Sequence, residues 1–274
     1  MEIKGVIWTL ASLCVWFALL SAVFAPLERY FGLHRQKYLR KSFATDVVFY
    51  FLSSLTPKLL LALPVSILAA VVHRYEPAAI YTWAAYLPIP LRAFLALVVG
   101  EIGVYWGHRL SHEIPFLWRF HAVHHSAEEM DWLVNSKAHP VDLLITRFCG
   151  LIPMFVLGLA QPASDQLDPV PMLTMFIGTT WGFFIHANLR WRFGPLEWLV
   201  ATPAFHHWHH TNDGPEFVNK NYATLLPAVD KVFGTLYLPP RQWPSKYGTE
   251  ELQPSGLAVQ LLHPVLPTLQ QDQR

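Results

Sequence analysis

The sequence predicts an all-α integral membrane protein with about four to five transmembrane helices and a cytosolic helical cap that carries most of the histidines. Three observations lead to this prediction. The 274 residues are 53% hydrophobic and only 14% charged, whereas an ordinary soluble domain has about 25% charged residues. Several apolar segments are long enough to cross a bilayer core of about 30 Å. Outside these segments, histidines recur at the spacing of one helical turn.

The first two apolar segments lie near the N-terminus. Residues 5–27 contain no charged side chain, and this run exceeds the ~7–15 apolar residues of a signal peptide, so we expect a membrane span. The second segment covers residues 47–72 and is interrupted by the TPK sequence at residues 56–58 and by Pro64. We expect one kinked span or a re-entrant hairpin, because neighbouring helices can satisfy the backbone groups that proline frees.

Further apolar segments cover residues 84–106, 141–160 and 170–185, and a short loop at residues 161–169 joins the last two. The organisation expected is in three parts. Residues 1–97 hold the first spans and a basic loop, residues 98–239 form the domain with the clustered histidines, and residues 240–274 form a polar, proline-containing tail.

Basic residues predict the orientation of these spans. The segment after the first span contains Arg29, Arg35, Lys37, Arg40 and Lys41, and the positive-inside rule places it in the cytosol. Counting spans forward puts every histidine cluster on the cytosolic side, and the loop with two aspartates at residues 161–169 outside. A bacterial inner membrane is the favoured location, and the endoplasmic reticulum is the alternative.

Charge and cysteine content exclude other classes. A formal net charge of +1 gives no electrostatic footprint for a nucleic acid, so no nucleic-acid partner is expected. The two cysteines, Cys14 and Cys149, both lie in apolar segments and are too few for an iron–sulfur cluster. We expect both to be small buried hydrophobic residues.

The histidines form a spaced pattern. An H-x-x-x-H motif is followed by H-x-x-H-H, a single histidine and a second H-x-x-H-H. Such spacing places imidazoles on one face of a short helix, and a single H-x-x-H-H should arise by chance only about 0.03 times in such a chain. We therefore expect these side chains to bind metal. The nine candidate ligands are His108, His112, His121, His124, His125, His186, His206, His209 and His210.

Two other histidines are ambiguous. His207 lies inside the second H-x-x-H-H, but the motif needs only its neighbours, and His139 stands in an HPVD sequence. Both a ligand and a structural role are left open for these two side chains.

The number and type of ligands restrict the metal. Nine imidazoles exceed the coordination shell of one ion, so two ions are expected. No thiolate is available, whereas structural zinc sites usually use cysteine. Imidazole-rich ligation suits iron, copper, zinc or nickel, and redox chemistry at a membrane face favours iron.

The order of these motifs resembles the fatty acid hydroxylase superfamily, and more closely its sterol desaturase branch. The resemblance covers residues 98–239 and rests on YWGHRLSHEIPFLWRFHAVHHS, HANLRWRFGPLEWLVATPAFHHWHHT and NKNYATLLPAVDKVFGTLYLP. The departures are small: the family usually has Arg at the position of His207 and Trp at the position of Val229. Neither position is a candidate ligand.

The resemblance implies a membrane-embedded, non-haem di-iron enzyme. Such an enzyme uses O2 and two electrons to hydroxylate or desaturate C–H bonds of a membrane lipid, such as a sterol or a fatty acyl chain. The nine histidines above match the family's iron ligands by position. A zinc-dependent membrane hydrolase and a histidine-rich metal transporter are the alternatives, although transporters place their ligands within the spans.

Four residues are candidates to support the metal ligands. Glu101 lies in the third apolar segment, where an ionisable residue is costly and usually functional, and it shares a helical stripe with Tyr105, His108 and His112. Its carboxylate is expected to accept a hydrogen bond from a ligating imidazole. The alternative is that Glu101 pairs with Arg92 or extends its carboxylate to the membrane interface. Asn188 and Asp230 are similar candidates.

Other polar and aromatic residues are expected to be structural. Asp131 and Asp142 are expected to be solvated or to cap helices. The aromatic sequences WLVNS and RWRFGPLEW are expected to form an interfacial belt.

The chain contains no recognisable electron carrier. It lacks a G-x-G-x-x-G fingerprint and a haem-binding HPGG sequence. We therefore expect a separate ferredoxin- or cytochrome b5-like donor. The expected contacts for an acidic donor are Arg190, Arg192, Lys220 and Lys231.

Overall fold

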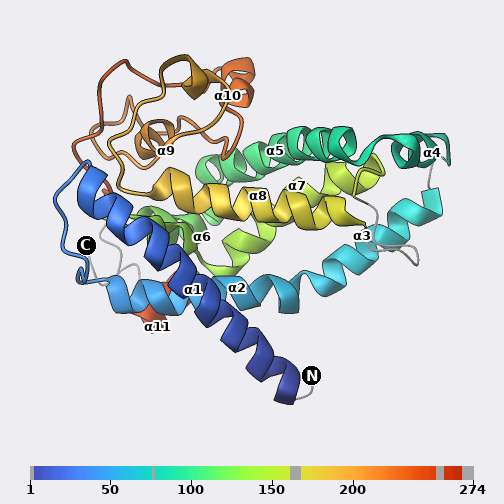
Figure 1. Ribbon diagram of the computed structural model, residues 1–274, viewed down its shortest axis with the longest axis horizontal. Helices are drawn as coiled ribbons and strands as arrows, with labels where there is room; N and C mark the ends of the chain where they lie inside the picture. The colour runs from blue at the N-terminus through green and yellow to red at the C-terminus, as the bar shows by residue number, and fades with distance from the viewer. Residues whose placement is uncertain (1–2, 76–77, 161–167, 251–255, 267–274) are drawn as a thin grey trace.

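The structure is a computed structural model that describes residues 3–75, 78–160, 168–250 and 256–266. Within these ranges the only strand-like contact is an isolated bridge between Thr211 and Tyr247, which confirms the all-α class. The elements, shown in Figure 1, are α1 (Ile3–Phe31), α2 (Phe43–Leu60), α3 (Ala62–Tyr75), α4 (Ala78–Tyr86), α5 (Ile89–Glu113), α6 (Pro115–His125), η1 (Trp132–Ser136), α7 (Pro140–Val156), α8 (Pro169–His186), η2 (Gly194–Trp198), α9 (Pro203–His209), α10 (Pro227–Phe233) and α11 (Leu257–Leu262).

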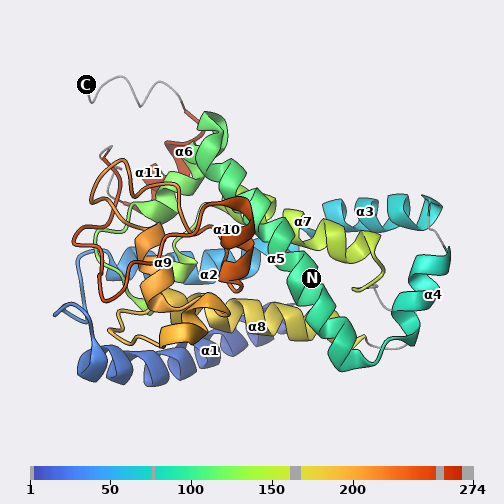
Figure 2. The same ribbon diagram turned by 90° about the horizontal axis from the view of Figure 1, so that it is seen from above.

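In the part of the chain that the structure describes, three stretches of helix are long and apolar enough to cross a membrane: Lys4–Phe31, Phe43–Val72 and Ile89–Glu113. The second includes both α2 and α3, which follow one another along the same direction in Figures 1 and 2. This segment is therefore kinked and does not fold back as a hairpin. Helices α7 and α8 run alongside α5, and the total of four or five spans stays a prediction.

The third span differs from the prediction at both ends. Helix α5 begins at Ile89 and not at residue 84, because Pro88 is the N-cap and Pro90 stands in the first turn, where a missing N–H is tolerated. The helix then continues past residue 106 to Glu113. His108 and His112 therefore stand on the same continuous helix as the apolar segment.

Glycines allow α5 and α7 to pack closely. A Cβ at Gly103 would lie 2.2 Å from the carbonyl oxygen of Cys149, and a Cβ at Gly150 would lie 2.8 Å from the Val104 side chain. The backbones can approach this closely only where a Cβ is absent. This contact fixes the middle of α7 against α5.

An aromatic core joins the first helices to the cap. Trp132 of η1 is only 2% exposed and packs with Phe24 of α1, Tyr50 of α2 and Phe183 of α8. The expected interfacial position of WLVNS is therefore wrong, because this tryptophan fills the space where these helices meet. Cys14 also differs from the prediction, since its side chain is exposed on α1.

Candidate metal centre

The structure brings all nine predicted histidines together in two groups. The first group contains five imidazoles from α5, α6 and α9, and the second contains four from α6, α8 and the end of α9. Within each group the nitrogen atoms that could hold an ion lie within 4.8 Å of one another. The five-histidine group is His108, His112, His121, His125 and His209, and the four-histidine group is His124, His186, His206 and His210.

Each H-x-x-H-H motif contributes to both groups. In α6, His121 and His125 face the first group, whereas His124 between them faces the second. In the second motif, His209 faces the first group and its neighbour His210 faces the second. Residues four apart share a helix face, and an adjacent residue is turned by about 100°, so a short helix between two sites can serve both.

The imidazoles meet through their Nε2 atoms. In the five-histidine group, the Nε2 atoms of His108 and His121 are 3.1 Å apart, and those of His125 and His209 are 3.0 Å apart. In the four-histidine group, the corresponding distances are 3.2 Å for His124 and His186, 3.0 Å for His186 and His206, and 3.2 Å for His206 and His210. These short distances have the geometry of neighbouring ligands on one ion.

The opposite nitrogen of several imidazoles is held by a backbone carbonyl. Nδ1 of His108 donates to the carbonyl of Tyr222 at 2.7 Å, and Nδ1 of His209 donates to that of Lys220 at 2.8 Å. Nδ1 of His124 and of His186 bond in the same way to Lys137 and Gly182, at 2.9 and 2.7 Å. A proton held at Nδ1 leaves the Nε2 lone pair free, so the contacts prepare these rings for metal binding.

Asp142 supports the centre, although it was expected to be solvated or to cap a helix. Its Oδ1 lies 3.0 Å from Nδ1 of His121, and both side chains are buried. The residue stands in the first turn of α7, which the close contact with α5 places beside α6. Spacing gave no sign of this pair, because 21 residues separate its members.

Contrary to the prediction, Glu101 does not accept a hydrogen bond from an imidazole, and it does not pair with Arg92 either. Its Oε1 accepts the backbone N–H groups of Thr224, Leu225 and Leu226 at 2.6, 2.6 and 3.2 Å. Arg92 instead pairs with Asp168 at 2.5 Å. Glu101 therefore anchors the segment that precedes α10 to the membrane helix α5.

Tyr105 and Asp230 also have other partners. The Tyr105 hydroxyl lies 3.0 Å from Oγ1 of Thr235. Asp230 accepts the backbone N–H groups of Tyr222 and Ala223, both at 2.8 Å. Neither side chain bonds an imidazole, but Asp230 fixes the segment whose carbonyl, at Tyr222, bonds His108.

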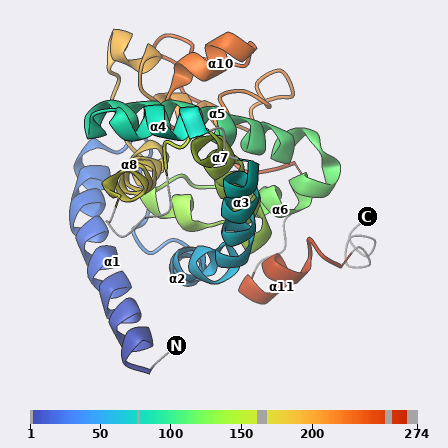
Figure 3. The same ribbon diagram turned by 90° about the vertical axis from the view of Figure 1, so that its right-hand side faces the viewer.

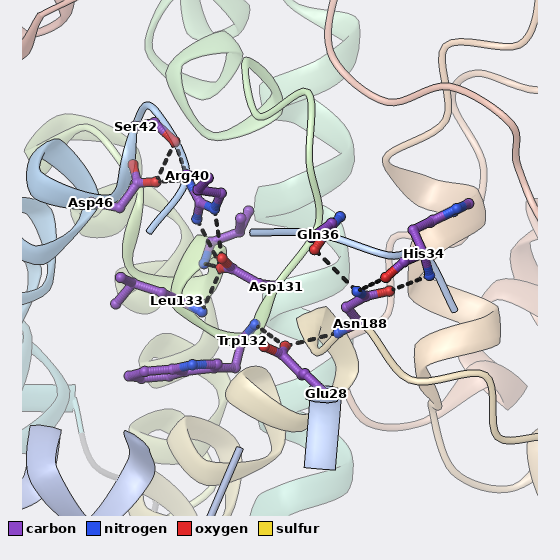
Figure 4. A network of polar contacts seen from close by, with 11 residues as sticks. Glu28, His34, Gln36, Arg40, Ser42, Asp46, Asp131, Trp132, Leu133 and Asn188 are labelled. Carbon is purple, nitrogen blue, oxygen red and sulfur yellow. Dashed lines mark hydrogen bonds and ion pairs between the residues drawn. The ribbon is translucent and has the colours of Figure 1, made fainter. Parts of the chain in front are cut away.

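Asn188 belongs to a polar network that joins α1 to the cap (Figure 4). Its side-chain amide accepts from the backbone N–H of His34 at 3.0 Å and donates to the backbone carbonyl of His34 at 2.8 Å. Oε1 of Glu28 accepts from the backbone N–H groups of Asn188 and Trp132, at 2.9 and 2.8 Å. Asn188 therefore contacts no imidazole ring of the two groups, and it secures the chain two residues after His186.

A buried ion pair completes the network. Arg40 donates to both carboxylate oxygens of Asp131, at 2.6 and 2.8 Å, and also pairs with Asp46. Asp131 in turn caps η1 by accepting the N–H groups of Leu133 and Val134, which confirms its predicted capping role. The basic loop after α1 is thereby tied to the cap.

His139 and His207 lie outside both groups. Nδ1 of His207 is 2.9 Å from the Tyr247 hydroxyl and its Nε2 is 3.1 Å from the carbonyl of Ala187. His139 caps α7 by accepting the N–H of Val141, and its other nitrogen bonds the carbonyl of Leu261. Because both ring nitrogens of each side chain are in use, these two histidines are structural.

Burial lowers the pKa of imidazoles in both groups. Desolvation lowers the pKa of His124 to about 3 and the pKa of His207 to about 4. The pKa values of His125, His206, His209 and His210 are also well below the ordinary value, first because of burial and then because of neighbouring imidazoles. Neutral rings have the free lone pair that a metal ion requires.

Comparison with known proteins gives a consistent set of relatives. Residues 93–235 match the model of the fatty acid hydroxylase family. The chain is 36% identical to the ornithine lipid hydroxylase OlsE of Rhizobium tropici over 183 residues, which cover 66% of this chain and 53% of that protein. It is 32% identical to human alkylglycerol monooxygenase over 162 residues, covering 57% of this chain and 34% of that protein. The chain thus spans about half, or less, of the length of these relatives. No solved structure matches.

Proposed function

The chain belongs to the fatty acid hydroxylase family, and from this premise we propose that it is an O2-dependent lipid hydroxylase of the membrane whose nine histidines hold two iron ions. The observation that carries the proposal is the convergence of nine imidazoles in two groups, all of them buried except the partly buried His112. Membership of the family supports iron as the metal, and the apolar helices that lead into the site support a substrate from the bilayer.

The donor set fits iron. All nine candidate ligands are imidazoles, a ligand type that suits iron as well as copper, zinc or nickel. The neighbouring Nε2 atoms are 3.0 to 3.2 Å apart, which is close enough for adjacent ligands of one ion. Membership of the family supports iron over the zinc of the hydrolase considered as an alternative.

The protein contributes position and environment. When bound, the iron ions would supply the O2 chemistry needed to oxidise an unactivated C–H bond, which side chains alone cannot do. The backbone carbonyls of Tyr222, Lys137, Gly182 and Lys220, together with Asp142, hold five imidazoles by Nδ1. Burial lowers the pKa of rings in both groups, which favours the neutral form that binds metal, and it excludes bulk water from the centre.

The names of the relatives guide the proposal about substrate and reaction. One is a hydroxylase of ornithine lipid and another is a monooxygenase of alkylglycerol. We infer hydroxylation in preference to desaturation, on a hydrocarbon chain of a lipid with a polar head. The closer likeness to the sterol desaturase branch stays a prediction.

The proposal includes a separate electron donor and a cytosolic metal centre. Arg190 is exposed, whereas Arg192 forms an ion pair with Glu197 at 3.0 Å, so Arg190 is the more accessible cation for an acidic partner. Lys220 is half-buried, and its backbone carbonyl holds His209. A ferredoxin- or cytochrome b5-like protein that docks near Lys220 would approach the five-histidine group through His209.

The test combines metal analysis with lipid analysis. The full chain, reconstituted anaerobically with Fe(II) in nanodiscs made from host lipids, should bind two iron ions per chain. With O2 and a reduced donor it should add one oxygen atom to a lipid, and omitting the donor should stop turnover. Full activity with zinc alone, or sustained turnover without any reductant, would contradict the proposal.

A further inference from the structure

An exposed apolar surface projects from the cap beside the membrane helices. It is formed by η2 and α10, and we call it the shelf. Its side chains are strongly exposed for their type: Leu196 is 58% exposed, Trp198 50%, Leu199 61%, Val232 77% and Phe233 37%. Surfaces that face water rarely expose so many large apolar side chains together, and such patches usually mark a site that contacts protein or membrane.

The shelf is attached to the sides of α5 and α8. The ring of Phe233 packs edge-on against Trp106 of α5, with centroids 5.1 Å apart. After η2, the carbonyl of Ala201 accepts the indole N–H of Trp181 of α8 at 2.8 Å. Figures 1 and 3 show α10 along the flank of α5 and not beyond its end. The shelf therefore lies alongside the apolar helices and not beyond their cytosolic ends.

The attachment points lie near the cytosolic end of the apolar part of α5. Helix α5 begins at Ile89, and Trp106 follows 17 residues later, which is about 26 Å along the helix at ~1.5 Å per residue. A bilayer core of about 30 Å that begins at Ile89 would have its cytosolic boundary close to the level of Trp106. The outer face of α5 is also apolar here, with Ile102, Trp106 and Leu110 37%, 39% and 37% exposed, so the shelf continues a lipid-facing surface.

The charges of the shelf fit a lipid headgroup layer. Each of its two elements contains one acid, and both acids are turned inward: Glu197 pairs with Arg192, and Asp230 is fully buried. The remaining charge, Lys231, has its Nζ 5.5 Å from the centre of the Trp198 ring. Tryptophan and lysine together are typical of the boundary between acyl chains and headgroups.

We propose that the shelf is inserted into the leaflet next to the metal centre, with Leu196, Leu199 and Val232 among the acyl chains and Lys231 at the level of the phosphates. Continuity with the apolar face of α5 selects the bilayer as the occupant over a second copy of the chain or a soluble partner. Part of the predicted cytosolic cap is then a monotopic membrane element, in line with the interfacial position expected for RWRFGPLEW, and this holds whatever reaction the centre catalyses.

Environment-sensitive probes on the full chain in phospholipid nanodiscs test this placement without any measurement of turnover. In a background with Cys14→Ser and Cys149→Ala, single cysteines are introduced by Leu196→Cys or Val232→Cys and labelled with NBD. Met175→Cys, which is 63% exposed on α8, is the lipid-facing control. Glu129→Cys, on an exposed position of the cap, is the aqueous control. Unchanged iron content shows that each variant is folded.

The proposal expects Leu196→Cys and Val232→Cys to give blue-shifted emission that doxyl-labelled phospholipids quench as strongly as they quench Met175→Cys. Water-like emission without quenching, as for Glu129→Cys, would overturn it. Blue-shifted emission that doxyl lipids do not quench would also overturn it, because the shelf would then be covered by protein.

Discussion

Asp142 Oδ1 lies 3.0 Å from Nδ1 of His121, and both side chains are almost fully buried. The only carboxylate that bonds a candidate metal ligand among the described residues thus comes from the first turn of a different helix, α7. Such a contact fixes the ring orientation and raises the basicity of the ligand.

Replacement of this acid should weaken metal binding. Asp142→Asn keeps the size of the side chain but removes the negative charge, and we expect iron affinity to fall about 10- to 100-fold. Iron retained per chain during titration with a chelator measures the effect. Asp213→Asn, in an exposed contact with Ser245, is the matched control. Equal iron retention by the two variants would show that Asp142 does not support the centre.

Substitution of the adjacent residues His206 and His207 should affect the metal content differently. His206 belongs to the four-histidine group, whereas His207 bonds Tyr247 and the carbonyl of Ala187. His206→Ala should therefore lose about half of the bound iron. His207→Gln should keep the metal and lose about 1–3 kcal/mol of stability through its hydrogen bonds. The iron content and the unfolding temperature of both variants test these expectations. Loss of iron from His207→Gln would show that His207 is a metal ligand.

The metal-free protein should become less stable below neutral pH. The folded-state pKa of His124 is about 3 and that of His207 is about 4, both below the ordinary value of about 6.5. The unfolded chain therefore binds more protons as the pH falls through 6.5, and stability is lost progressively down to the folded pKa values. At pH 5 each group should cost about 2 kcal/mol.

Thermal unfolding of the metal-free protein between pH 5 and pH 8 measures this dependence. The unfolding temperature should fall as the pH is lowered from about 7 toward 5. A melting temperature that stays constant or rises toward pH 5 would mean that these imidazoles are protonated, or solvated, in the folded protein.

The carboxylate of Glu101 should hold the segment before α10. Glu101→Ala would leave buried N–H groups at residues 224–226 without an acceptor, and an unsatisfied buried donor costs about 1–3 kcal/mol. Hydrogen exchange of these amides should become faster and the free energy of unfolding should fall. Glu113→Ala, whose partner Arg109 lies four residues away on the same helix, should change stability by less than about 1 kcal/mol. Unchanged exchange at residues 224–226 in Glu101→Ala would contradict this role.

The sequence alone determined the class of the protein and the identity of the clustered histidines. Apolar runs of membrane length and the helical spacing of His121, His124 and His125 are local properties of the chain. The structure accordingly contains the expected helices and brings together the nine predicted imidazoles. Family membership agrees with the resemblance that these motifs suggested.

Only the tertiary structure decided how the histidines are divided and what holds them. His124 joins His186, 62 residues away, whereas its neighbour His125 joins His209, 84 residues away. The groups that orient the rings are mostly backbone carbonyls, which every residue possesses, so no sequence pattern marks the carbonyl of Tyr222 as the partner of His108. Glu101 was misassigned for the same reason: its position in α5 was readable, but the backbone that packs against that helix depends on how the chain folds as a whole.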